Sequence, residues 1–63
     1  MAKLTESQIK TIIRAEYHGL KESYPSITAD YIDDIVRKLL NGEEVKGVVA
    51  MFIRKDMEDA GLL

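Results

Sequence analysis

The stretch that decides the fold is residues 5–24, which read TESQIKTIIRAEYHGLKESY. Its apolar side chains recur at intervals of three and four residues, so at about 100° per residue they fall on one side of a helix. Thr5 and Gln8 have the spacing of a capping box, and Pro25 prevents the helix from continuing past Tyr24. The pattern predicts a helix over 5–24 whose apolar stripe comprises Ile9, Ile12, Ile13, Tyr17, Leu20 and Tyr24.

A second amphipathic stretch covers residues 29–40. Thr28 is a good N-cap ahead of it, and the pair Asn41-Gly42 is typical of a left-handed helix end. We therefore expect a helix over 29–40. Its predicted buried face comprises Tyr31, Ile32, Ile35, Val36 and Leu39.

A third helix is expected over residues 44–60, with Gly61 as its stop signal. Gly47 lies inside this range and costs about 0.5–1 kcal/mol relative to alanine. We interpret it as a place where another backbone comes close. The predicted buried face comprises Val45, Val48, Val49, Phe52, Ile53, Met57 and Ala60.

Size and composition limit what these helices can form. A chain of 63 residues makes one domain over 1–63, near the lower limit for folding unaided. It has no cysteine and one histidine, which excludes disulfides and thiolate or histidine metal clusters, so we expect no metal and no cofactor. Helix packing or self-association must then stabilise the fold. The sequence predicts an all-α, small three-helix bundle in an up-down-up arrangement, with the 5–24 helix as its spine.

Hydropathy and charge narrow the classes of partner. The longest unbroken apolar run is six residues, 48–53, which is too short to span a membrane. Met1-Ala2-Lys3 is too polar for a signal peptide, so we expect a cytoplasmic protein without membrane contact. The net charge of −2 argues against a nucleic-acid partner, because phosphate contacts favour basic domains.

Two carboxylates interrupt the apolar stripes: Glu16 in the first helix and Asp56 in the third. If they face each other inside the bundle, desolvation raises their pKa values and they could divide acid and base roles. If they lie at the rim, they reach water or pair with a cation. An enzyme also needs a pocket of about 300–1,000 Å³, which three short helices can hardly enclose. We expect no enzyme and no catalytic residues. The cations that could pair with Glu16 or Asp56 at the rim are Arg14, Arg37, Lys38 and Arg54.

Basic residues gather beside the apolar stripe of the first helix. Lys10, Arg14 and Lys21 project to one side, joined by Lys3 if the helix extends that far. They form either a solvated flank, with their alkyl stems on the core edge, or a contact strip for an acidic partner.

Some apolar residues fall outside the predicted core. Leu40 and Met51 lie off the core faces of their helices, and Leu62 and Leu63 follow the stop glycine. The last two either cap the core or remain exposed. If these side chains group together, they form a patch of the kind that marks a partner site.

We favour a non-enzymatic protein–protein interaction module, as an adaptor, inhibitor or subunit whose partner is another protein or a second copy. The alternative is a small nucleic-acid-associated regulator that acts as a dimer through a helix-turn-helix-like unit of 29–40 and 44–60. In that motif the start of the second helix meets DNA. Here Glu43 and Glu44 would oppose the phosphates.

Overall fold

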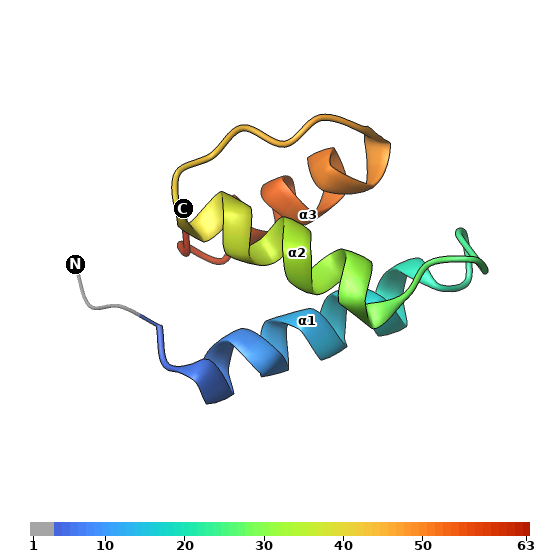
Figure 1. Cartoon of the computed structure of the whole chain (residues 1–63), viewed down its shortest axis with the longest axis horizontal. Coiled ribbons are helices and arrows are strands. Elements are labelled where there is room, and N and C mark those ends of the chain that lie inside the picture. Colours follow the sequence, from blue (N-terminus) through green and yellow to red (C-terminus); the bar gives the residue numbers. More distant parts are fainter. Residues whose placement is uncertain (1–3) are drawn as a thin grey trace.

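The computed structural model describes residues 4–63, and all regular secondary structure in that range is helical. The three helices are α1 (Glu6–Leu20), α2 (Ala29–Leu40) and α3 (Val48–Asp59). α2 lies between the other two and packs against both (Figure 1). The prediction of an all-α three-helix bundle is confirmed.

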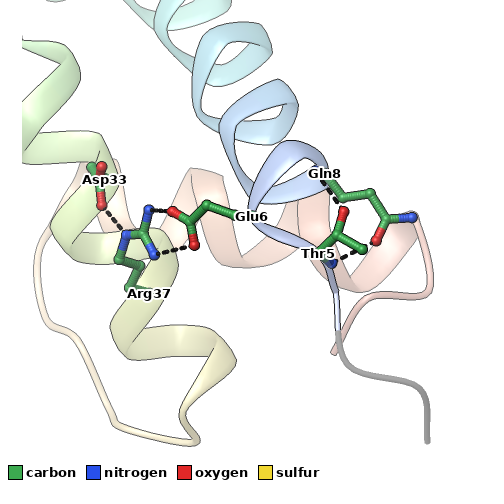
Figure 2. A network of polar contacts seen from close by, with 5 residues as sticks. All are labelled: Thr5, Glu6, Gln8, Asp33 and Arg37. Atoms are coloured by element: carbon green, nitrogen blue, oxygen red, sulfur yellow. Dashed lines mark hydrogen bonds and ion pairs between the residues drawn. The ribbon is translucent and has the colours of Figure 1, made fainter.

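α1 begins where the capping box predicts. The Thr5 hydroxyl accepts from the Gln8 amide at 3.1 Å, and the Gln8 side-chain oxygen accepts from the Thr5 amide at 2.8 Å (Figure 2). The end differs from the prediction, because the regular helix stops at Leu20 and a turn follows. The Tyr24 amide still donates to the Leu20 carbonyl at 2.8 Å. Pro25 sets only the last position that the helix could reach. The helix ends earlier because Gly19, a poor helix former, weakens its last turn.

α2 spans residues 29–40 as predicted. The Thr28 hydroxyl accepts from the Tyr31 amide at 3.2 Å, which satisfies one of the free donors of the first turn. At the other end Gly42 adopts a φ of 81°, and the Glu43 amide donates to the Lys38 carbonyl at 2.9 Å. This pattern is a Schellman motif, in which a glycine in left-handed geometry reverses the chain and pairs the last carbonyl groups.

α3 starts at Val48 rather than at residue 44, and Gly47 is its N-cap. The φ of Gly47 is 114°, a backbone angle that residues with a side chain rarely adopt. A Cβ at this position would meet nothing within 4 Å. The interpretation of Gly47 as an interior helix residue at a close backbone approach is wrong. The backbone angle is what requires glycine.

The connection over residues 41–47 sets the direction of α3. It runs back along the molecule without forming a helix, so that α3 points the same way as α2 and opposite to α1 (Figure 1). These residues reach about 23 Å when extended. That is enough to return along the 12 residues of α3, a helix about 18 Å long. The predicted up-down-up arrangement is therefore wrong.

The core is apolar, and α2 contributes more to it than either neighbour. Ile32 and Val36 have no exposed surface, because α2 is covered on two sides. Because α2 packs against both α1 and α3, it is the central element, and the prediction of the 5–24 helix as the spine is wrong. The buried side chains are Ile13, Leu20, Ile32, Ile35, Val36, Leu39, Ala50, Ile53 and Met57.

Four residues predicted to be buried are exposed. α3 packs chiefly against α2, so only a narrow stripe of it is covered. This leaves Val48 and Phe52 beside the contact, and Ala60 beyond it. Tyr31, in the first turn of α2, is 50% exposed.

An ion-pair network joins α1 to α2. Arg37 of α2 reaches between Asp33 of the same helix and Glu6 of α1 (Figure 2). Both terminal nitrogens of Arg37 donate to the Glu6 carboxylate, with 3.3 Å between Nη1 and Oε2. The hydrogen bond from Arg37 lowers the pKa of Glu6. The start of α1 therefore lies against the end of α2, as the antiparallel arrangement of these two helices requires.

Candidate functional site

An open hollow of about 670 Å³ lies where α2 and α3 end. Leu39 and Leu40 line it from the last turn of α2, and Leu62 and Leu63 line it from the segment after α3. Figure 1 shows the C-terminal end of the chain beside the end of α2. We term this hollow the leucine groove. Its volume is within the range of ligand pockets, but it is open to solvent, so it is not the enclosed pocket that three short helices were expected to lack.

The backbone after α3 turns two of these leucines toward α2. Gly61 adopts a φ of 77°, and its amide donates to the Glu58 carbonyl at 3.0 Å. The Leu62 amide donates to the Met57 carbonyl at 2.8 Å, which completes a second Schellman motif. Leu62 is consequently half-buried against the core, whereas Leu63 is 46% exposed. Of the two interpretations of these residues, Leu62 caps the core and Leu63 remains exposed.

Charged side chains form the rim of the leucine groove. Glu43, Glu44, Glu58 and Arg54 line it beside the leucines. Arg54 pairs with Glu58 of the same helix, with 3.2 Å between Nε and Oε1. Within residues 4–63, neither Glu43 nor Glu44 takes part in an ion pair. The Asn41 side-chain amide donates to Glu43 at 3.2 Å. The rim therefore carries an excess of negative charge.

Lys38 is a cation close to this rim, although it does not line the groove. Its ammonium group lies 3.0 Å from the Asp34 carboxylate one turn earlier. The hydrogen bond with Asp34 raises the pKa of Lys38, and the Glu43 carboxylate adds a smaller contribution. The charge of Lys38 is thus balanced mainly by its own helix.

The structure brings together three of the seven residues predicted to contact a partner: Leu40, Leu62 and Leu63. Glu43 and Glu44 are not among the predicted contact residues, because the sequence pattern places them at or just before the start of the predicted 44–60 helix. The signal that could have placed them is the Asn41-Gly42 helix end just before them, which turns the following residues back over the end of α2.

Met51, a fourth predicted contact residue, lies outside the groove and is 68% exposed. Val48 and Phe52 are 58% and 49% exposed. Met51 and Phe52 follow Val48 by three and four positions on α3, so the three residues lie on one side of the helix. We term this set the α3 outer face.

The remaining predicted contact residues, Lys10, Arg14 and Lys21, are exposed on or directly after α1, and none lines the groove. The Lys21 ammonium lies 5.8 Å from the centre of the Tyr17 ring. Lys10 helps to lower the pKa of Glu6. Lys3, the fourth member of the predicted strip, is outside the described residues.

Glu16 and Asp56 lie near each other at the rim of the bundle. Glu16 is half-buried and Asp56 is exposed. Burial raises the pKa of Glu16 to about 7. Hydrogen bonding to Asp56 and the negative charge of Asp56 add to this shift. The ion pairs of Arg37, Lys38 and Arg54 involve other carboxylates. Neither Glu16 nor Asp56 lines the leucine groove.

Within residues 4–63, no three histidine, aspartate or glutamate side chains are grouped so that they could hold a metal ion. In the same range, no helix has both the length and the apolar character needed to cross a membrane.

Comparisons with protein-family models, curated proteins and solved structures find no match for this chain. We therefore infer its function from the leucine groove and the charges around it.

Proposed function

We propose that this protein is a non-enzymatic protein-binding module that accepts an apolar segment of a partner in the leucine groove. The observation that carries the proposal is the meeting of Leu40, Leu62 and Leu63 in one open hollow beside the buried Leu39. Concave apolar surfaces of this size are the usual sites of recognition in proteins. An open groove suits a peptide segment, because the segment can enter along its length.

Two observations favour a protein partner over a nucleic acid. Glu43 and Glu44 stand at the rim, where they would repel phosphates. In addition, a helix-turn-helix joins its helices by a turn of three or four residues. Here the connection is the whole of residues 41–47 and leaves α2 and α3 pointing the same way (Figure 1). This geometry gives no support to the nucleic-acid alternative.

The leucines alone give modest affinity. Burying one leucine completely contributes about 1.5–3 kcal/mol. Leu40 and Leu62 are half-buried already and Leu63 is about half exposed, so covering all three gains roughly 2–4 kcal/mol. A millimolar dissociation constant needs about 4 kcal/mol. A partner must therefore gain further contacts at the charged rim.

A second form of the same function is self-association through the α3 outer face. Val48, Met51 and Phe52 are the observation that favours it. However, three partly exposed side chains offer on the order of 300 Å². A stable interface buries about 800 Å² on each partner. We therefore place the main binding function in the leucine groove and expect self-association to be weak.

Photo-crosslinking in cell extract tests the proposed function. A photoreactive residue at position 63 should give discrete protein adducts that excess unlabelled protein suppresses. Met51→Glu should suppress them as well as the unaltered chain does, whereas Leu63→Glu should not. Both changes place a carboxylate on an exposed apolar residue, so Met51→Glu controls for charge and solubility. Equal suppression by the two variants would contradict the proposal.

A further inference from the structure

We infer that the partner segment is basic as well as apolar, with aliphatic side chains that enter the leucine groove and lysine or arginine side chains that meet Glu43 and Glu44. The inference rests on the proposed function and adds the chemistry of the partner to it. The observation that carries it is the negative charge of Glu43 and Glu44 at the groove, which no ion pair within residues 4–63 balances.

The charges that border the groove do not cancel. Arg54 is held by Glu58 at 3.2 Å, so this pair contributes little net charge. Glu43 and Glu44 stand beside the leucines and form no ion pair within residues 4–63. A cation on a partner could therefore pair with them without displacing an existing partner.

The helix ends add to this negative field. α2 ends at Leu40 and α3 ends at Asp59, and both ends border the groove. The C-terminal end of a helix carries the equivalent of about half a negative charge. The two helices point the same way, so their negative ends act together here (Figure 1). This arrangement attracts cations and opposes acidic peptides, nucleic acids and anionic membrane surfaces.

The carboxylate of Glu43 is positioned before any partner arrives. Its backbone amide donates to the Lys38 carbonyl at 2.9 Å in the motif that ends α2. Its side chain accepts from the side-chain amide of Asn41 at 3.2 Å. Ion pairs at this rim would form next to leucines that a partner covers. Reduced contact with water would make them stronger than pairs on an open surface.

Three matched peptides test the inference. Each is an amphipathic sequence of about 14 residues with leucines on one side, and its polar positions are lysine, glutamine or glutamate. Binding to the full chain is followed by fluorescence anisotropy at about 50 mM and about 500 mM salt. The lysine peptide should bind about tenfold more tightly than the glutamate peptide at low salt, and this difference should shrink at high salt.

Two charge-reversal variants locate the effect. Glu44→Lys should weaken binding of the lysine peptide about fivefold, because it replaces an attraction with a repulsion. Glu22→Lys changes the net charge equally at an exposed position that does not line the groove, and it should change affinity less than about twofold. Circular dichroism checks that both variants keep their helical content.

The outcomes separate the inference from the proposed function. Equal binding of all three peptides, weakened by Leu63→Glu, would overturn the basic partner and leave the groove as a binding site. Equal weakening by Glu44→Lys and Glu22→Lys would also overturn the inference, because only overall charge would then matter. Binding of none of the peptides up to about 1 mM, an affinity of about 4 kcal/mol, would overturn both.

Discussion

The Leu62 amide donates to the Met57 carbonyl at 2.8 Å, and this bond turns the chain after α3 back toward α2. The same bond pattern at the end of α2 joins the Glu43 amide to the Lys38 carbonyl. One motif therefore positions an apolar side of the leucine groove, and the other positions its acidic rim. Helix termination and the candidate binding surface have the same structural origin.

Gly61→Ala should destabilise the fold and weaken groove binding. Gly61 has a φ of 77°, where a Cβ costs about 1 kcal/mol. Urea unfolding followed by circular dichroism should show this loss, and affinity for the lysine peptide should fall because Leu62 and Leu63 lose their fixed position.

Gly19→Ala is the matched control: Gly19 lies within α1 and a Cβ there meets nothing within 4 Å. It should stabilise the fold by about 0.5–1 kcal/mol and leave binding unchanged. If Gly61→Ala proves as stabilising as the control, this account of the turn is wrong.

Glu16 should make the stability of the fold depend on pH. Its pKa is raised in the folded state, so the folded chain holds a proton that the unfolded chain releases. This contribution is complete below the ordinary pKa of 4.5 and is lost as the pH rises through about 7. The side chain reaches water, so we expect a loss of about 1 kcal/mol rather than the full shift.

The measurement is urea unfolding at about pH 5 and pH 8 for the unaltered chain and for Glu16→Gln. The unaltered chain should lose stability relative to the variant at the higher pH. In a carboxyl NMR titration, Asp56→Asn should bring the midpoint of Glu16 down toward its ordinary value. An ordinary midpoint for Glu16 in the unaltered chain would end this explanation.

Arg37→Lys should weaken the contact between α1 and α2, because an ammonium group cannot donate to two carboxylates in the geometry of the guanidinium fork. The NMR titration of Glu6 should move up toward its ordinary value, since Arg37 is the main cause of its lowered pKa. At pH values above the ordinary pKa of Glu6, its ionised carboxylate stabilises the fold. This stabilisation is lost as the pH falls through the lowered pKa that Glu6 has in the folded state. Lys38→Ala removes a cation that pairs with Asp34 and should leave Glu6 unchanged. If Lys38→Ala shifted the Glu6 titration as much as Arg37→Lys does, the specific role of the Arg37 hydrogen bonds would be contradicted.

The chain should be a monomer at about 10–100 µM, because the α3 outer face offers much less area than a stable interface needs. Light scattering across a dilution series should give the mass of one chain, 7.1 kDa, in both low and high salt. Phe52→Lys should leave this mass unchanged. A dimer that persists on dilution and disappears in Phe52→Lys would make the α3 outer face the principal interface.

The sequence predicted local features of the fold more reliably than the way the helices pack. The Thr5 and Thr28 caps depend on side chains next to the helix they start, so they can be read from a few residues. The start of α3 could not be read in this way, because Gly47 fits both a helix interior and an N-cap at positive φ. That ambiguity hid the long connection, and with it the direction of α3.

For the candidate site, too, the sequence predicted single residues but not how they come together. Leu40, Leu62 and Leu63 could be selected as apolar residues outside the expected core. Their meeting with Glu43 and Glu44 depends on α2 and α3 ending at the same side of the molecule, which no local pattern encodes. Phe52 and Val48 were misplaced because helical periodicity indicates an apolar side but not how much of it a neighbour covers.

The most direct test of the leucine groove is an amide NMR titration of the full chain with the lysine peptide. We expect the largest shifts at residues that line the groove, including Leu40, Glu44 and Leu63, and little change at the residues of the α3 outer face. Glu44→Lys should reduce these shifts at equal peptide concentration. Shifts centred on Val48, Met51 and Phe52, or spread evenly over the surface, would contradict binding in the leucine groove.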